Sequence, residues 1–124
     1  MRFLARYAPA LALMAVIFVL SAQSSLPRVD TSFDVALRKA AHMTEFGLLW
    51  LLWLWALDGA RPRAAVCALA ITLAYAVSDE LHQSFVPGRH ASEWDVAIDA
   101  AGVGLAAAVW VLRSRATATR ARWP

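Results

Sequence analysis

The stretch AAHMTEFGLLWLLWLWAL, residues 40–57, decides the fold class. Its only ionisable side chains are His42 and Glu45, both near its start, and the polar pair Asp58-Gly59 follows its last residue. A helix needs about 20 predominantly apolar residues to cross the hydrocarbon core of a bilayer. Counted from Lys39, this stretch meets that length, so we predict a membrane-spanning helix over residues 39–57.

Three further apolar runs lie before and after this one. The first covers residues 8–24 and has Pro9 in its first turn, a position that suits proline. The runs over residues 64–84 and 93–112 reach spanning length only by including polar residues at one end. Together the four runs predict an all-α fold: an integral membrane bundle of four transmembrane helices, forming a single domain over residues 1–124.

The composition of the chain agrees with a membrane protein. Hydrophobic residues make up 60% of it and charged residues 17%, against roughly 45–50% and 25% in soluble domains. The net charge is +3, but the Arg residues stand at the ends of apolar runs instead of forming a stripe. We therefore expect membrane lipids as partners and no nucleic acid. With Cys67 alone, neither a disulfide framework nor a paired-cysteine metal site is possible.

The first run has an alternative interpretation as a secretory signal peptide. Arg2 and Arg6 would form its basic region, and Ala22-Gln23-Ser24 would be an acceptable cleavage site. A retained span is favoured, because three more apolar runs follow and must pack against other helices.

Basic residues predict the orientation of the bundle. They precede the first span, lie between the second and third, and follow the fourth; with four spans, these groups fall on one side. They are Arg2, Arg6, Arg61, Arg63 and the Arg-rich tail from Arg113 onward. Since cytoplasmic loops carry the excess of basic residues, we expect both termini in the cytoplasm. We also expect the tail to be frayed.

Under this topology the polar residues of the spans converge at the outer end of the bundle. Charged side chains at membrane depth are costly unless they pair or contact water. The turn predicted at residues 86–90 brings Arg89 next to the acids of the third span. In the fourth span, Gly102 and Ala106 continue the stripe of its two acids and allow close helix approach. The predicted binding residues are Lys39, His42, Glu45, Asp79, Glu80, Gln83, Arg89, Asp95 and Asp99.

Some of these polar residues also have a structural interpretation. Asp34 and Asp95 each stand three residues after a hydroxyl residue, which is the spacing of a capping box. Capping is favoured for Asp34, whereas capping and a site role are both open for Asp95. Lys39 either extends to the lipid headgroups or pairs with Glu45 or Asp79. The His and acid residues match no strong metal-ligand motif, so we predict no metal and no cofactor.

Three segments carry a resemblance to a known family. They are Ser21-Ala22-Gln23-Ser24, then Lys39-x-x-His42-x-x-Glu45-Phe46, and then Asp79-Glu80-x-His82-Gln83-x-Phe85-x-Pro87-Gly88-Arg89. Together with Asp95, Asp99 and Gly102, this pattern resembles the VanZ-like family over roughly residues 20–106. The chain departs from the family at Phe46, where Tyr is usual, at Asp99, where Asn is usual, and at Ala106, where a second Gly is common. Asp99 adds an acid that must be paired or protonated.

The resemblance implies a multi-pass protein of the bacterial inner membrane. The family takes its name from resistance to teicoplanin, a lipid-bearing glycopeptide antibiotic. What the resemblance implies is therefore a role at the cell envelope that affects susceptibility to lipoglycopeptides.

Three functions fit these residues. The first is a non-enzymatic protein that binds an amphiphile, such as a lipid-linked envelope precursor or a lipoglycopeptide, with Arg89 and Lys39 holding an anionic headgroup. The second is a membrane enzyme that acts on a lipid-linked envelope precursor, with Glu80, Asp79 or His42 as general acid or base. A proton-coupled transporter is the least favoured, because the inner halves of the spans lack ionisable residues. No particular oligomeric state is predicted.

Overall fold

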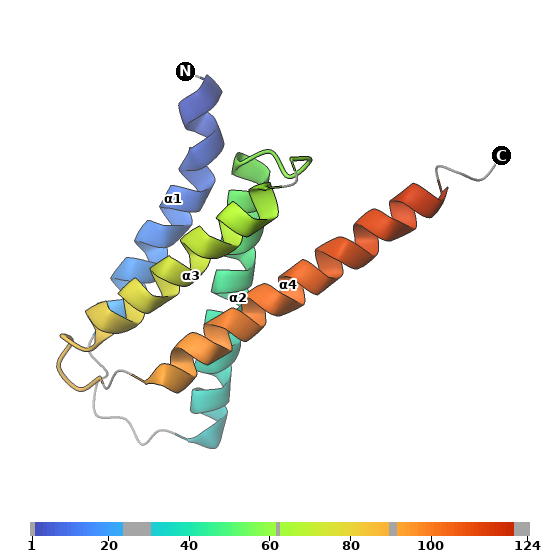
Figure 1. The fold of residues 1–124 in the computed structure, drawn as a ribbon. Coiled ribbons are helices and arrows are strands. Elements are labelled where there is room, and N and C mark those ends of the chain that lie inside the picture. Colours follow the sequence, from blue (N-terminus) through green and yellow to red (C-terminus); the bar gives the residue numbers. More distant parts are fainter. Residues whose placement is uncertain (1, 24–30, 62, 90–91, 121–124) are drawn as a thin grey trace.

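The computed structural model describes residues 2–23, 31–61, 63–89 and 92–120. Its helices are α1 (Arg2–Ser21), α2 (Ser32–Ala56), α3 (Ala64–Gln83) and α4 (Glu93–Arg120). The described residues contain no β-strand, so the prediction of an all-α fold is confirmed. Successive helices run in opposite directions, and both ends of the chain lie on the same side of the bundle (Figure 1).

Several helix boundaries differ from the predicted spans, most of all the starts of α1 and α2 and the end of α4. α2 begins at Ser32 instead of residue 39, because Thr31 and Asp34 form the predicted capping box and start the helix early. α4 continues to Arg120, so the prediction of a frayed tail is wrong as far as that residue. Arg and Ala are strong helix formers, which explains the extension. Ser24, the last residue of the predicted first span, lies outside the described residues.

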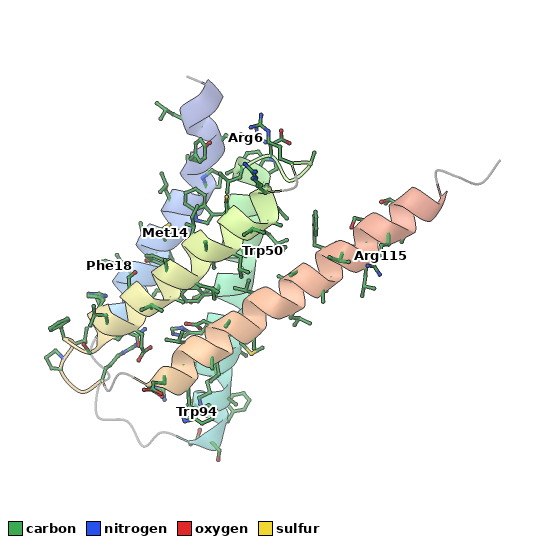
Figure 2. The ribbon with its side chains drawn as sticks, in the orientation of Figure 1. Arg6, Met14, Phe18, Trp50, Trp94 and Arg115 are labelled. Atoms are coloured by element: carbon green, nitrogen blue, oxygen red, sulfur yellow. The ribbon has the colours of Figure 1, made fainter. Side chains whose placement is uncertain are left out.

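The prediction that Pro9 lies in the first turn of its helix is wrong. Because α1 already begins at Arg2, Pro9 lies within the helix and not in its first turn. A proline there donates no backbone hydrogen bond, so the carbonyl one turn earlier loses its partner. Arg6, in the turn before it, ties α1 to the end of α2: its Nε and Nη2 donate to the Trp55 carbonyl at 3.2 and 2.9 Å. Figure 2 shows Arg6 near the loop that joins α2 to α3.

α2 is the central helix of the bundle and contacts the other three. Its large apolar side chains Phe46, Leu49, Trp50 and Leu54 form much of the core. Trp50 meets Trp110 of α4 edge to face, with ring centroids 6.2 Å apart. α3 packs against the core through small buried residues one turn apart, which are Ala64, Ala68, Thr72 and Ala76. Small side chains at this spacing let helix backbones approach closely.

α2 and α4 cross at two glycines. A Cβ atom added at Gly47 would lie 2.9 Å from the carbonyl oxygen of Gly102, and one added at Gly102 would overlap the backbone of Met43. The predicted close approach at Gly102 is therefore confirmed. Past the crossing, the C-terminal part of α4, which carries Arg115, extends away from the other helices (Figures 1 and 2).

Length and apolarity indicate a membrane-embedded protein. Among the described residues, three segments are long and apolar enough to cross a bilayer, namely Leu4–Ser21, Ala64–Gln83 and Glu93–Thr117. α2 is not one of them, and its polar residues include His42 and Glu45. Large apolar side chains are exposed on all four helices, among them Leu11, Phe33, Leu81 and Leu105. An apolar exterior of this kind suits lipid better than water.

Candidate functional site

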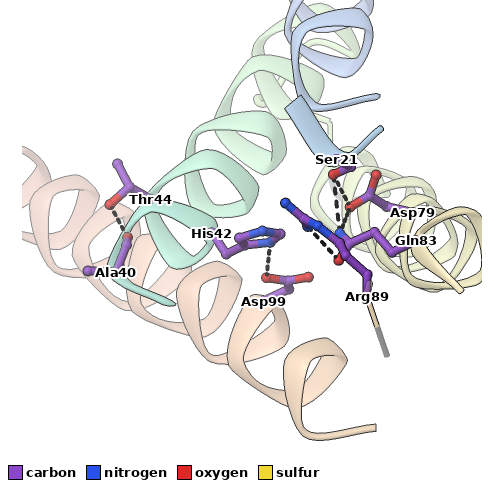
Figure 3. A network of polar contacts seen from close by, with 8 residues as sticks. All are labelled: Ser21, Ala40, His42, Thr44, Asp79, Gln83, Arg89 and Asp99. Carbon is purple, nitrogen blue, oxygen red and sulfur yellow. Dashed lines mark hydrogen bonds and ion pairs between the residues drawn. The ribbon is translucent and has the colours of Figure 1, made fainter. Parts of the chain in front are cut away.

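Buried polar side chains gather where the ends of α1 and α3 meet the first turns of α4 and the N-terminal half of α2. Figure 3 shows this polar cluster in two groups, one between α1 and α3 and one between α2 and α4. Its buried members are Ser21, Asp79, Glu80, Gln83 and Asp99. Polar groups at such depth are expected to be hydrogen-bonded to one another.

The first group centres on one carboxylate oxygen. Ser21 Oγ and Gln83 Nε2 both donate to Asp79 Oδ2, each at 2.8 Å. Gln83 Nε2 also lies 3.2 Å from Ser21 Oγ, and Gln83 Oε1 accepts a hydrogen bond of 2.9 Å from Arg89 Nη1. The expected contact between Arg89 and the acids of α3 is thus indirect: it passes through the Gln83 amide to Asp79.

A tight turn after α3 directs Arg89 back toward the helix. The Arg89 N–H donates to the Val86 carbonyl at 3.1 Å. Between them, Pro87 supplies a fixed φ and Gly88 has a φ of 81°, which L-residues with a side chain rarely adopt. Pro followed by Gly at these positions is typical of a type II turn. The turn predicted from the sequence is confirmed up to Arg89, and His90 lies outside the described residues.

Glu80 connects α3 to the start of α4. Its Oε1 accepts a hydrogen bond of 2.5 Å from the Ser92 N–H, while Ser92 Oγ accepts one of 3.2 Å from the Trp94 N–H. In a capping box, Asp95 would receive the Ser92 N–H. Here that N–H goes to Glu80, and Asp95 stays half-buried at the edge of the cluster. Trp94 is exposed beside it (Figure 2).

The second group is a pair across the α2–α4 crossing. His42 Nδ1 lies 3.4 Å from Asp99 Oδ1, and the Asp99 side chain is 3% exposed. This distance exceeds the usual range for an N–H···O hydrogen bond, and the two groups attract each other as charges only when the imidazole is protonated. Asp99, the acid at which the chain departs from the family pattern, therefore faces a histidine.

The predicted binding residues do not all join these contacts. The cluster brings together His42, Asp79, Glu80, Gln83, Arg89 and Asp99. Glu45 is half-buried one turn after His42, whereas Lys39 is exposed and stands outside the cluster. Ser21 was not among the predicted site residues, although its place at the end of the first apolar run marked it as polar at the right depth. His82 instead stacks on Phe18, with ring centroids 4.1 Å apart.

The chemistry of the cluster follows from this inventory. Within the described part of the chain, no three His, Cys, Asp or Glu side chains are arranged to hold a metal ion. The cluster offers several carboxylates, one guanidinium and one imidazole. Such a set can bind hydrogen-bonding and charged groups, or move a proton between them.

This fold and site define a class: a small α-helical membrane protein with a buried polar cluster at one end of its bundle. The chain belongs to the VanZ/LLP1 family, whose sequence profile matches residues 5–114. That range includes every residue of the polar cluster, and it confirms the resemblance to the VanZ-like family seen in the motifs. Neither the curated proteins nor the solved structures include a significant match to the chain.

Proposed function

We propose that this protein is a four-span protein of the bacterial inner membrane that binds the polar part of an amphiphile in its polar cluster. The observation that carries the proposal is the cluster itself, to which every helix contributes: Ser21 of α1, His42 of α2, Asp79 of α3 and Asp99 of α4. Burying several charges at one end of an apolar bundle is costly. A bundle that needed only stability would be better served by apolar residues there.

The central position of α2 supports a fourth span. It has 25 residues, which at roughly 1.5 Å each makes a helix about 37 Å long. This exceeds the hydrocarbon core of about 30 Å. The C-terminal half of α2, whose buried residues run from Phe46 to Ala56, packs between the three apolar helices. A helix enclosed in this way crosses wherever its neighbours cross, even though it is less apolar.

The orientation follows from the basic residues. Arg6, Arg61 and Arg113 lie toward the end of the bundle opposite the polar cluster, as the antiparallel order of the helices requires. With these residues in the cytoplasm, both termini are cytoplasmic and the polar cluster faces the outside. There it meets the headgroups of the outer leaflet, lipid-linked envelope precursors and arriving lipoglycopeptides.

The cationic anchors of the ligand are Arg89 and Lys39. Gln83 fixes one guanidinium nitrogen of Arg89 and leaves the others available to a phosphate or carboxylate. Lys39 is exposed on the part of α2 that precedes the bundle, where a flexible ammonium group reaches headgroups. The acids accept hydrogen bonds from hydroxyl or ammonium groups of the ligand.

The experiment is a susceptibility measurement with matched antibiotics. Overexpression in a glycopeptide-sensitive bacterium should change the inhibitory concentration of a lipid-tailed glycopeptide such as teicoplanin more than that of an untailed analogue. Arg89→Ala should abolish this difference at normal membrane abundance, and Arg113→Ala, an exposed arginine near the far end of α4, should preserve it. Equal effects on tailed and untailed compounds, with and without the protein, would contradict the proposal.

A membrane enzyme acting on a lipid-linked envelope precursor is the second candidate. The His42–Asp99 pair favours it, because a carboxylate beside an imidazole orients a general base. Glu80→Gln separates the two functions. Glutamine keeps the carbonyl oxygen that accepts the Ser92 N–H, so a binding protein tolerates the change. A catalyst that moves a proton through Glu80 loses activity.

A further inference from the structure

Two buried carboxylate oxygens in the polar cluster have no hydrogen-bond donor among the described residues: Asp79 Oδ1 and Asp99 Oδ1. The two residues are only 3% and 2% exposed, respectively. Leaving a buried acceptor without a partner is expensive, and more so when it belongs to a charged group. These two atoms therefore mark places where the described part of the cluster supplies no donor.

The donors among the described residues are directed elsewhere. Ser21 and Gln83 both donate hydrogen bonds to Asp79 Oδ2, the other oxygen of the Asp79 carboxylate. Arg89 donates to Gln83. In the described part of the chain, His42 Nδ1 is the group that approaches Asp99 Oδ1, at 3.4 Å, and this nitrogen also has no hydrogen-bond partner there. Each of the two groups of the cluster therefore contains a buried carboxylate oxygen that lacks a hydrogen-bond donor within the described ranges.

The chemistry of the missing donor is constrained by charge. Two buried carboxylates attract a cation, and a primary ammonium combines a positive charge with three N–H donors. A quaternary ammonium has the charge without the donors, and a hydroxyl has a donor without the charge. Arg89, whose side chain lies beside both groups in Figure 3, supplies the complementary charge for a phosphate.

We propose that the polar cluster binds a lipid headgroup in which a primary ammonium stands next to a phosphate, as in phosphatidylethanolamine. The ammonium donates to the free oxygen of Asp79, the nearby Asp99 adds negative charge, and the phosphate contacts Arg89. This proposal rests on the amphiphile-binding function and names its ligand. It also explains why acids outnumber bases in the cluster, since a purely anionic headgroup would leave the second oxygen of Asp79 without a donor.

Binding to lipids with identical acyl chains and different headgroups tests the proposal. The full-length protein in detergent is titrated with phosphatidylethanolamine, phosphatidylcholine or phosphatidylglycerol, and the bound lipid is quantified by native mass spectrometry. Phosphatidylethanolamine should bind about tenfold more tightly than either of the others, as expected for the loss of one charge-assisted hydrogen bond. Free phosphoethanolamine should bind more weakly than the lipid, and equal binding would overturn the assignment to a lipid.

Variants then connect the preference to the two acids. Asp79→Asn and Asp99→Asn should each bring phosphatidylethanolamine close to phosphatidylcholine in affinity. Asp58→Asn, in the loop at the opposite end of the bundle, should leave the preference intact. If an Asn variant fails to fold, the affinities of the unmodified protein for the three lipids still test whether the ammonium is recognised. Equal affinity for the three lipids would show that the ammonium is not recognised, and this would overturn the ammonium proposal while leaving amphiphile binding in place. Absence of binding by any lipid would contradict both.

Discussion

Gly102 on α4 lies so close to the backbone of Met43 on α2 that a Cβ atom on the glycine would overlap the methionine carbonyl. The contact joins backbone to backbone, so neither side can yield by changing a rotamer. One turn before Gly102 along α4 is Asp99, and next to Met43 on α2 is His42; their side chains lie 3.4 Å apart. The glycine contact therefore sets the separation of the two acid–base partners.

Replacing Gly102 by Ala should destabilise the bundle by about 1–3 kcal/mol, as overpacking of a filled interface does. Gly104→Ala is the matched control, because a Cβ there meets nothing within 4 Å. It should change stability by less than about 1 kcal/mol. The unfolding midpoint of the purified protein in detergent measures both. Equal midpoints for the two variants would show that the helices separate freely at the crossing.

Gln83→Leu should lower stability by about 1–3 kcal/mol, because it removes a donor from the buried Asp79 and an acceptor from Arg89. Ser84→Ala is the control one residue further on. Its hydroxyl is exposed and bonds only to the Leu81 carbonyl of the same turn, so a change within about 0.5 kcal/mol is expected. The same unfolding assay applies. A Gln83→Leu variant as stable as the unmodified protein would mean that the first group contributes nothing to folding.

Tyr75→Phe should cost about 0.5–1.5 kcal/mol. The Tyr75 hydroxyl donates to the Met14 carbonyl of α1 at 2.6 Å and is a direct hydrogen bond between α1 and α3. The aromatic contact with Phe46, at 6.1 Å between centroids, is kept by phenylalanine. The loss therefore isolates the hydrogen bond. Ser78→Ala is the control, because the Ser78 hydroxyl bonds within its own helix. Equal unfolding midpoints for Tyr75→Phe and Ser78→Ala would contradict a stabilising role for the Tyr75 hydrogen bond.

The position of the polar cluster was predictable because lipid makes isolated charges expensive. The polar ends of separate spans had to converge, and the structure brings His42, Asp79 and Asp99 to one end of the bundle. The partner of each group was not predictable. Arg89 contacts the Gln83 amide instead of an acid, because the turn geometry and not charge alone decides which acceptor it reaches. Likewise, the Ser92 N–H bonds Glu80 and not Asp95, which only the approach of α3 to α4 determines.

Helix boundaries were the least predictable part of the fold. Apolar length indicates where lipid ends, whereas a helix continues for as long as capping and propensity favour it. α2 therefore starts at the Thr31 cap, outside the predicted span, and α4 runs on to Arg120. The same limit applies to Pro9, whose position relative to the helix start depends on where α1 begins.

The proposed four-span arrangement predicts on which side of the membrane each loop lies. The α2–α3 loop with Gly59 is at the end of the bundle where Arg6 binds the Trp55 carbonyl, and the turn with Gly88 is at the end with the polar cluster. Reporter domains that are active on only one side of the membrane, fused after Gly59 and after Gly88, should give opposite signals. A third fusion after Arg115 should match Gly59, because α4 returns the chain to the first side. Matching signals at Gly59 and Gly88 would mean that α3 does not cross the membrane. Opposite signals at Gly59 and Arg115 would mean that only one of α3 and α4 crosses it.

Cleavage of the first helix as a signal peptide would show separately, as a mature protein that starts near Ser25. Since Ser21 holds Asp79 by a hydrogen bond of 2.8 Å, we expect the uncleaved chain in the membrane, with its N-terminus on the cytoplasmic side.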